Sequence, residues 1–487
     1  MLGAMEYFIK PWEHQLKSIE RAKGLQEFAF FYQVGCGKTL SALGTLRHKF
    51  EQHKGLLRTL IVGPPIVIEN WRAEIYKNTE LRSANVGVLY GPGKKRVEQF
   101  KKYRSQKDVW VTNFESMLMS DLYMEFSRWH PEVLIVDESH RCKNISAKRT
   151  KLIAKLAMQT KYRYLLSGTP ILNTPMDVFS QYLILDGGKS FGRNFYIFRS
   201  KYFYDKNAHM PRHVHFPNWQ VRPGAEAEIK EVMFKKCDYV KKADCLDLPP
   251  LVKQKIFVEM SPPQRKAYEQ MKDDFLTVMD EGLCSVDLAI TKALRLQQIV
   301  SGFLPLETTE GVMEHEFTKN PRLDALKEIL TDVLPNKVLI WAVFKQNYRV
   351  IAELLQNMKV PYVEVHGGIT QKRKFENVDK FNNDEDIKVL IGHPGSGGIG
   401  INLVSANYSV FYSRDFSLEH DIQAEARNYR GGSERFDKIT RIDLVCSSSI
   451  DELIEQKLSE KQSMSGRILL NELVKGMGGL TNGGSAT

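Results

Sequence analysis

The segment Gly35-Cys36-Gly37-Lys38-Thr39 contains the residue types needed to hold the phosphates of a nucleotide. Glycines let the backbone curl so that successive amides point at phosphate oxygens, at the start of a helix whose dipole also favours anions. Lys38 can reach the β- and γ-phosphates of ATP, and Thr39 supplies a hydroxyl to Mg²⁺. We therefore expect this segment to bind ATP, although the full phosphate-loop pattern has a glycine where this chain has Tyr32.

An acidic pair, Asp137 and Glu138, directly follows the apolar run Val133–Val136. A buried strand over that run would place both carboxylates at its carboxyl end, the usual ligand edge of an open α/β sheet. Asp137 would hold Mg²⁺, directly or through water, and Glu138 would orient and deprotonate an attacking water. An Asp-Glu pair alone usually marks a solvated turn, but the phosphate-binding segment in the same half favours the catalytic interpretation.

Two arginines in the second half, Arg427 and Arg430, could complete the site. They are three residues apart, which predicts one helix face, and Gly431-Gly432 would end that helix. Guanidinium is permanently charged and forks onto phosphate oxygens, so one or both could neutralise charge that develops on the γ-phosphate. The alternative is a pair of surface arginines. If they do act on the nucleotide, ATP would close two lobes of the chain.

The elements that must position these residues follow the same pattern in both halves. Short apolar runs, often β-branched or aromatic, alternate with longer segments such as Lys38–Phe50 and Ala147–Met158, which predicts parallel sheets wrapped by helices. The expected strands are Phe28–Tyr32, Thr59–Val62, Val109–Thr112, Val133–Val136 and Tyr162–Leu166, then Lys337–Val343, Tyr362–His366, Ile387–Ile391, Ser409–Tyr412 and Thr440–Val445. The predicted fold class is therefore α/β, with two lobes.

Between the two halves this alternation fades, and helical, aromatic-rich stretches take over. We expect an ATP-binding lobe over residues 1–180, helical insertions and an interlobe linker over 181–335, a second lobe over 336–475 and a flexible tail over 476–487. The predicted helical stretches are Phe195 to Tyr204, Pro263 to Met279 and Ala289 to Ile299. The linker is expected near Leu246 to Val258, where Pro249-Pro250 punctuates the chain.

The composition is that of an ordinary globular protein of two or three domains, with 487 residues, 43% hydrophobic and 26% charged. No apolar run approaches the ~20 residues that cross a bilayer. The net charge of +11 weakly favours a polyanionic partner. One basic cluster could either bind nucleic acid or form a solvated helix face: Lys94, Lys95, Arg96, Lys101, Lys102, Arg104 and Lys107. The six cysteines show no paired short spacing, which indicates a reducing compartment without zinc or a disulfide framework.

These motifs resemble those of helicase superfamily 2, and within it the Snf2-like ATPases. Besides the segments above, the matching stretches in chain order are Leu60-Ile-Val-Gly-Pro64-Pro65, Val111-Thr112-Asn113, His140-Arg141-Cys-Lys143-Asn144, Ser167-Gly168-Thr169-Pro170, Leu248-Pro249-Pro250, Met260-Ser-Pro-Pro-Gln264, Lys337-Val-Leu-Ile-Trp341, Gly397-Gly-Ile-Gly-Ile-Asn402 and Gln423-Ala-Glu-Ala-Arg427-Asn-Tyr-Arg430. Three stretches depart from the family: Tyr32-Gln33 replaces an acidic pair, His393-Pro394-Gly395-Ser396 replaces Ser-Thr-x-Ala, and Gly431-Gly432-Ser433 replaces Ile-Gly-Gln.

The resemblance implies further roles for individual residues. Gln15 would read the adenine edge, and His140, Thr169 and Gln423 would couple nucleotide state to lobe closure. The positions along the nucleic-acid groove would be Pro64, Thr112, Asn113, Ser396 and Asn402. The fold implied is two RecA-like lobes with helical insertions protruding between the stretch Ser167–Pro170, which resembles motif III, and the stretch Lys337–Trp341, which resembles motif IV.

The function implied is that of a DNA-stimulated ATPase that uses ATP and Mg²⁺, translocates on DNA and remodels branched DNA, by fork remodelling or Holliday-junction branch migration. The serine that follows the acidic pair, Ser139, resembles the residue at that position in the branch of the family that remodels forks. Three alternatives stay open: displacement of proteins from duplex DNA, an RNA helicase, and a DNA-binding scaffold with a dead ATP site. We expect a monomer that acts on duplex or branched DNA, without a membrane, in the cytoplasm of a bacterial or phage-infected cell.

Overall fold

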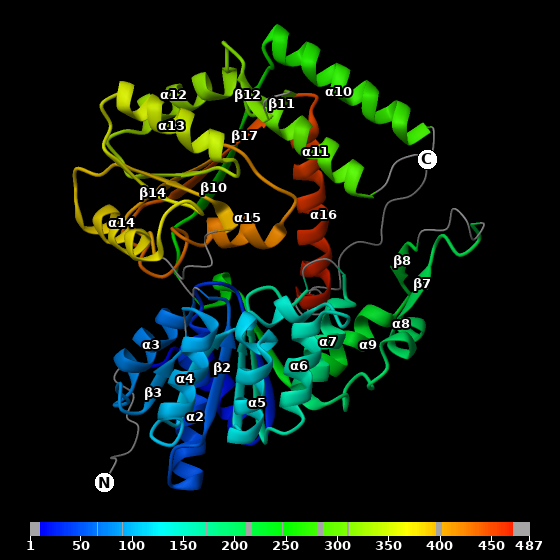
Figure 1. The fold of residues 1–487 in the computed structure, drawn as a ribbon, viewed down its shortest axis with the longest axis vertical. Helices are drawn as coiled ribbons and strands as arrows, with labels where there is room; N and C mark the ends of the chain where they lie inside the picture. The colour runs from blue at the N-terminus through cyan, green and yellow to red at the C-terminus, as the bar shows by residue number, and fades with distance from the viewer. Residues whose placement is uncertain are drawn as a thin grey trace, which may run out of the picture. The chain divides into compact units, whose positions relative to one another are not determined.

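The computed structural model describes residues 10–65, 67–89, 91–171, 174–210, 217–245, 247–280, 286–308, 311–395 and 402–470. The chain divides into two compact units: unit 1 is Met1–Cys245 with Lys461–Thr487, and unit 2 is Leu246–Glu460. Each unit is built around its own large sheet (Figure 1). Of the predictions above, those for Ser396 and for the tail 476–487 lie outside the described residues.

Unit 1 contains a seven-stranded sheet in the order β3-β4-β2-β5-β6-β1-β9, and its strands pair in parallel throughout. The strands are β1 (Glu27–Tyr32), β2 (Thr59–Gly63), β3 (Val86–Val88), β4 (Val109–Asn113), β5 (Val133–Asp137), β6 (Tyr162–Ser167) and β9 (Cys237–Val240). The helices are α1 (Glu13–Lys23), α2 (Lys38–His53), α3 (Val67–Asn78), α4 (Gly93–Tyr103), α5 (Ser120–Trp129), α6 (Lys148–Ala157), α7 (Asp177–Asp186), α8 (Phe195–Tyr202) and α9 (Ala225–Phe234). An antiparallel hairpin, β7 (Phe203–Asp205) with β8 (Trp219–Val221), follows α8.

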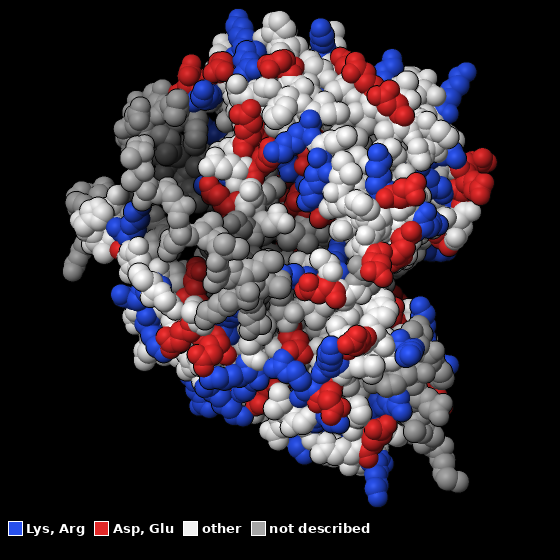
Figure 2. Space-filling view, turned by 180° about the vertical axis from the view of Figure 1, so that it is seen from behind, with Lys and Arg blue, Asp and Glu red and all other residues white. Residues whose placement is uncertain are grey.

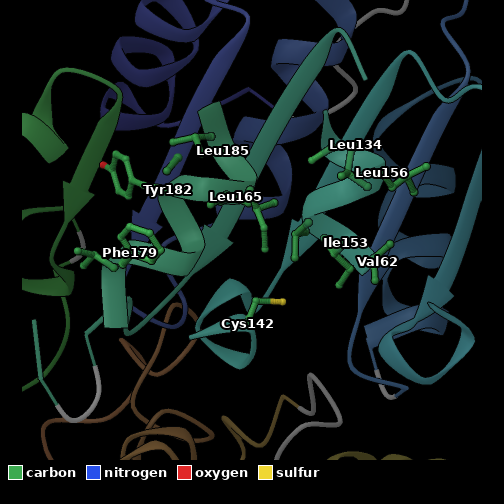
Figure 3. Close-up of a cluster of buried hydrophobic side chains, with 14 of the residues drawn as sticks. Val62, Leu134, Cys142, Ile153, Leu156, Leu165, Phe179, Tyr182 and Leu185 are labelled. Carbon is green, nitrogen blue, oxygen red and sulfur yellow. The ribbon is translucent and has the colours of Figure 1, made fainter. Parts of the chain in front are cut away.

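The sheet of unit 1 is buried on both faces, because side chains alternate between the faces along each strand. Along β1, Phe30 and Tyr32 join one core, to which α1, α2 and α3 contribute, whereas Ala29 and Phe31 join the other. The second core is filled from α4 to α9, and Figure 3 shows part of it, with Leu134 and Leu165 of the sheet among side chains of α6 and α7. This two-sided burial explains why the strands are continuous apolar runs.

Unit 2 contains a six-stranded sheet in the order β10-β17-β16-β13-β15-β14, again paired in parallel. Its strands are β10 (Leu251–Val258), β13 (Val338–Trp341), β14 (Tyr362–Val365), β15 (Val389–Gly392), β16 (Tyr408–Phe411) and β17 (Ile439–Cys446). Its helices are α10 (Pro262–Asp280), α11 (Val286–Val300), α12 (Pro321–Val333), α13 (Lys345–Asn357), α14 (Gln371–Asn383), α15 (Leu418–Glu425) and α16 (Ile450–Leu470), the last of which runs on past Glu460. A hairpin of β11 (Phe303–Thr308) and β12 (Gly311–Glu316) follows α11.

The prediction of an α/β fold with two parallel sheets is confirmed, and the ten expected strands are present within a few residues of their predicted ends. Three further strands of the two large sheets escaped prediction, as did the strands of the two hairpins. β3 is short and contains Gly87, where a side chain would collide with the Trp110 ring. β9 and β10 are polar edge strands, and β10 occupies the stretch expected to be a linker.

Candidate functional site

The phosphate-binding segment lies between the end of β1 and the start of α2. Gly35 and Gly37 have φ angles of 99° and 73°, in the left-handed region that glycine adopts without strain. The Cys36 side chain between them is fully buried in the core. The loop therefore turns its side chain inward and leads directly into the amino end of α2, where Lys38 and Thr39 are the first two residues.

Gln15 is buried against this loop. Its Nε2 donates to the Gly37 carbonyl at 3.0 Å, and its Oε1 accepts from the Trp12 amide at 2.7 Å. A Cβ added to Gly37 would lie 2.2 Å from the same amide nitrogen, so a glycine is required at that position. His14 adds a contact of 2.9 Å between its Nε2 and the Cys36 carbonyl. In this structure Gln15, expected at the adenine, holds the loop in shape.

Asp137 and Glu138 are at the carboxyl end of β5, as predicted. Asp137 is 5% exposed, and its Oδ2 accepts from the Trp71 indole at 2.9 Å. Burial, with the Glu138 charge beside it, raises the pKa of Asp137 to about 6, against the opposing effects of Lys38 and Trp71. Trp71 was not predicted as a site residue; it is an anchor for the acidic pair.

The phosphate-binding lysine meets the acidic pair. Lys38 Nζ lies 3.6 Å from Glu138 Oε1, and both side chains are largely shielded from solvent. The other Glu138 oxygen lies 3.4 Å from His140 Nδ1. Glu138 has a left-handed φ of 52°, a conformation uncommon for a residue with a side chain, and it begins the short 3₁₀ helix Ser139–Cys142. The structure thus brings Lys38, Glu138 and His140 together.

Ser167 connects the two residues that were expected to couple nucleotide state to closure. Its Oγ lies 2.9 Å from His140 Nδ1 and accepts from the Thr169 amide at 3.1 Å. Next to it, Ser139 Oγ donates to Gln181 Oε1 at 2.8 Å, and Gln181 Nε2 donates to the Pro170 carbonyl at 2.6 Å. Sequence reasoning assigned no role to Ser167 or Gln181. Ser167 belongs to the quoted Ser-Gly-Thr-Pro stretch, whereas Gln181 had no sequence signal.

The residues expected along nucleic acid in unit 1 are mostly covered. Pro64 is buried, and Thr112 is fully buried, with no hydrogen-bond partner for its Oγ1 among the residues that the structure describes. Asn113 Oδ1 accepts from the Ser116 amide, from Ser116 Oγ and from Arg96 Nη1, at 2.9 to 3.0 Å. Asn113 and Pro64 nevertheless lie at the carboxyl ends of adjacent strands, next to the strand that carries Asp137.

The basic cluster of residues 94–107 divides into anchored and exposed side chains. Arg96 donates to the Gly91 carbonyl as well as to Asn113, and Arg104 pairs with Glu125 at 2.6 Å. Lys94 and Lys95 at the start of α4 are exposed. On the face shown in Figure 2, Lys and Arg are interspersed with Asp and Glu. Part of the cluster is therefore structural, and only its exposed lysines are free to meet a polyanion.

Arg427 and Arg430 are not on a helix, so the prediction that they share one helical face was wrong. α15 ends at Glu425, five residues before Arg430 and well before Gly431-Gly432, so Arg427 and Arg430 lie in the turn beyond the helix. The Arg427 carbonyl accepts from the Leu403 amide at 3.0 Å, which fixes the backbone there. Arg427 is 4% exposed, and Arg430 is half-buried. Asn402, another predicted site residue, is exposed one residue before Leu403.

An ion network not foreseen from the sequence holds α15 against the sheet. Arg441 of β17 donates to both carboxylate oxygens of Asp421 at 2.7 and 3.0 Å, to Glu425 at 2.9 Å and to Asp443 at 2.9 Å. Burial would raise the pKa of Asp421, but the charge and hydrogen bonds of Arg441 hold it below its usual value. Gln423, on the same helix, donates to Glu419 at 3.1 Å. The network therefore positions the helix from which the arginine-bearing turn departs.

Two family models match the chain. The SNF2-related domain matches residues 29–301, and the helicase conserved C-terminal domain matches residues 321–432. The phosphate-binding loop from Gly35 onward, the acidic pair and the Ser167 network fall within the first match. Arg427 and Arg430 fall within the second. None of the described helices is long and apolar enough to cross a membrane.

Several curated proteins resemble the chain over most of its length. TATA-binding protein-associated factor BTAF1 of Arabidopsis thaliana is 27% identical over 90% of this chain and 24% of its own length. An uncharacterized ATP-dependent helicase of Mycoplasma pneumoniae is 24% identical over 94% of this chain and 42% of its own. Protein p41 of Acyrthosiphon pisum secondary endosymbiont phage 1 is 24% identical over 94% of this chain and 97% of its own. The chain thus spans less than half of the first two relatives.

Among solved structures, the Sulfolobus solfataricus SWI2/SNF2 ATPase core in complex with dsDNA is 20% identical, covers 97% of both chains and has a TM-score of 0.45. The SNF2-related match alone covers more than half of the chain, and the helicase C-terminal match follows it in order. The resemblance read from the motifs is confirmed, as is the assignment to a class of ATP-dependent enzymes. The chain belongs to the SNF2-related family of ATP-dependent helicases.

Proposed function

We propose that this chain hydrolyses ATP at the site formed by Lys38, Asp137 and Glu138 and uses the energy to translocate on DNA. The observation that carries the proposal is the meeting of Lys38, Glu138 and His140 at the carboxyl edge of the first sheet. A phosphate-binding lysine beside a carboxylate that a histidine orients is an arrangement suited to in-line attack of water on a phosphate.

In the proposed reaction, the amides of residues 35–37 and the amino end of α2 bind the phosphates. Lys38 moves from Glu138 to the β- and γ-phosphates, which frees that carboxylate to accept a proton from the attacking water. His140, on the other carboxylate oxygen, keeps Glu138 oriented. Ser167 links this movement to Thr169, so the same hydrogen bonds could report the state of the nucleotide.

The residues present fit Mg²⁺. Asp137 and the Thr39 hydroxyl offer oxygen ligands, and Mg²⁺ in phosphate-transfer sites is commonly held by one carboxylate together with substrate phosphates. The raised pKa of Asp137 reflects a buried carboxylate that lacks full compensation for its charge, a deficit that a cation would remove. When bound, the ion neutralises charge on the phosphates.

The proposal also specifies the DNA on which the protein acts. We propose that the protein acts as a monomer on duplex DNA and on branched DNA, with fork remodelling or branch migration as the outcome. Displacement of proteins from duplex DNA is the second candidate, and one relative, BTAF1, is named as a factor associated with the TATA-binding protein. The similarity to a phage protein and a Mycoplasma protein supports action in the cytoplasm of a bacterial or phage-infected cell.

Turnover of ATP with single-stranded, duplex, forked and four-way DNA, and with RNA, tests the proposal. Stimulation by DNA but not by RNA is expected, with the largest effect on forked or four-way DNA. Lys38→Ala should abolish turnover, and Glu138→Gln should keep ATP bound but unhydrolysed, because the binding lysine and the magnesium ligand remain. Lys17→Ala, an exposed lysine of α1, serves as the control. Turnover near the wild-type rate in Lys38→Ala would show that the catalytic loop lies elsewhere.

A further inference from the structure

Two thiols far apart in the sequence meet beside the phosphate-binding loop. β1 pairs with β9 up to Tyr32 and Val240. Beyond these strands, the Lys242 amide donates to Gln33 Oε1 at 3.0 Å, so both segments leave the sheet together. Three residues further along each segment lie Cys36 and Cys245, and each thiol shifts the pKa of the other. Cys245 Sγ also donates to the Lys241 carbonyl at 3.1 Å. Cys36 belongs to the buried core, and Cys245 packs against that core.

The two thiols have different environments. Cys36 is fully buried, and the hydrogen bond to Cys245 together with burial raises its pKa far above the usual value. Cys245 is partly exposed, and the pKa of its thiol is lowered by the hydrogen bond from Cys36, with the Lys242 charge contributing. Cys142 and Cys237, in contrast, are fully buried in the other core, and burial raises the pKa of each to about 12. The accessible and more acidic thiol is thus Cys245, with a second thiol in contact.

We propose that Cys36 and Cys245 form a reversible disulfide that inactivates the phosphate-binding loop. The oxidant is a peroxide or a small disulfide. With hydrogen peroxide, the Cys245 thiolate attacks one oxygen and becomes a sulfenic acid as hydroxide leaves; the Cys36 thiol then displaces water and closes the S–S bond. Two thiols and one peroxide thus yield one disulfide and two waters. With a small disulfide, Cys245 first forms a mixed disulfide, which Cys36 resolves, and two small thiols are released.

The inactivation follows from the position of Cys36 and rests on the proposed function of this loop. A disulfide brings two sulfurs to about 2.05 Å, much closer than two unbonded thiols can lie. Cys36 lies between the left-handed glycines 35 and 37, and Gln15 leaves no room around Gly37. A pull on Cys36 must therefore displace the amides that face the phosphates. Cys245 is also the last residue of unit 1 before unit 2 begins, so the bond ties the loop to that boundary.

The experiment uses the full chain, reduced or treated with hydrogen peroxide or oxidised glutathione. Peptide mapping by mass spectrometry without reductant reports the cross-link, and turnover and binding of a fluorescent ATP analogue report the loop. We expect a Cys36–Cys245 cross-link, loss of most ATP binding and turnover, and recovery with dithiothreitol. Cys245→Ser should keep the turnover of the reduced protein and lose its sensitivity to oxidant. Cys446→Ala, which removes a buried thiol of unit 2, should stay as sensitive as the wild type.

Three results would overturn the proposal: no cross-link between these residues, a cross-link that leaves binding and turnover intact, or equal sensitivity of Cys245→Ser. A reduced protein that shows no turnover on any nucleic acid would instead contradict the proposed function. The cross-link map and the binding of the ATP analogue would still test whether the disulfide forms and whether it blocks ATP binding.

Discussion

Asp137 illustrates how a residue can serve chemistry at the expense of stability. Its carboxylate is buried at a strand end next to a second carboxylate, so the folded protein holds a charge that water would stabilise better. The compensating contacts are the Lys38 charge, the Trp71 indole and the Glu138 amide, which donates to Asp137 Oδ1 at 2.9 Å. Without a cation this buried charge lowers the stability of the folded protein, and a bound cation would compensate for it.

This arrangement predicts how stability changes with pH. Asp137 ionises near its usual value of 3.8 in the unfolded chain and near 6 in the folded one, so the folded state binds the proton more tightly. The stability that this group contributes is therefore present below pH 3.8 and is lost as pH rises through 6. Asp137→Asn, whose amide oxygen can still accept from Trp71, should abolish turnover and raise the free energy of unfolding at pH 7.5 by ~1–3 kcal/mol.

Urea denaturation without Mg²⁺ at pH 5.0 to 7.5 measures this difference. The gain should shrink towards pH 5, where the wild-type carboxyl is already mostly protonated. Asp121→Asn, an exposed carboxyl on α5, should show no comparable gain. A variant at position 137 that is less stable than the wild type at every pH would mean that the carboxylate stabilises the fold.

At the level of single residues, the sequence predicted which residues carry the chemistry better than it predicted the contacts of those residues. Lys38, Asp137 and Glu138 were predictable because a loop, a strand end and an apolar run leave local signals. The contacts of Gln15, Trp71 and Ser167 were not, because they depend on distant partners; for Gln15 the family resemblance predicted a place at the nucleotide but not its bond to the loop. The cysteines show the same limit: Cys36 and Cys245 have no short spacing, and only the pairing of β1 with β9 brings them together.

Among the elements, α15 is held by ion pairs as well as by apolar packing. Arg441 contacts two acids on that helix and one on its own strand, and lies over the Phe411 ring at 3.9 Å. Arg441→Met should destabilise unit 2 by ~3–5 kcal/mol, because it removes the main partner of several buried carboxylates and leaves only the ion pairs of Arg414 and Lys253. Lys253→Met removes the exposed partner of Glu425 and should cost less than ~1 kcal/mol.

Chemical denaturation followed by fluorescence and by proteolysis of unit 2 gives both values. Arg441→Met should also slow hydrolysis more than it weakens ATP binding, because the misplaced turn would reduce transition-state stabilisation. Equal effects of the two substitutions on stability would show that Arg441 does not hold the helix.

The start of α4 offers a test of the basic cluster. Lys94→Glu with Lys95→Glu changes only exposed charges and spares Arg96, which is needed to anchor Asn113. If these lysines bind the DNA backbone, affinity and the dependence of binding on salt should both fall, by roughly one counterion for each lysine that no longer neutralises a phosphate. Lys17→Glu with Lys23→Glu, on α1, is the matched control. Unchanged affinity and unchanged salt dependence would assign the start of α4 to a solvated surface.

Elements with a strong local pattern were predicted, and those that depend on sheet edges were not. The buried strands are apolar because helices cover both faces, so they stand out in the sequence. β9 and β10 are edge strands with polar side chains, and their pairing partners lie far away in the chain. The end of α15 was also mispredicted, because Ala426 to Arg430 continue the helical composition although the backbone there forms a turn.

For the molecule as a whole, the two halves of the proposed chemistry belong to different units. Lys38, Asp137 and Glu138 are in unit 1, and Arg427 and Arg430 are in unit 2. We propose that DNA binding favours a closed arrangement in which one or both arginines reach the γ-phosphate. DNA would then stimulate hydrolysis by bringing positive charge to the transition state, which for an arginine finger increases the rate roughly 10³-fold or more.

Arg427→Ala and Arg430→Ala test this mechanism. Each should lose the DNA-stimulated rate preferentially, keep ATP binding and keep most of the small rate without DNA, because only the closed state uses the arginine. Arg435→Ala, an exposed arginine whose side chain donates to the Val404 carbonyl, is the control for a change of charge in the same region. Melting temperatures measured beside both rates separate catalysis from folding, since an arginine that only supports unit 2 would lower the melting temperature as well. Equal loss of both rates in a protein of normal stability would contradict closure and leave the assignment of the ATP site in place.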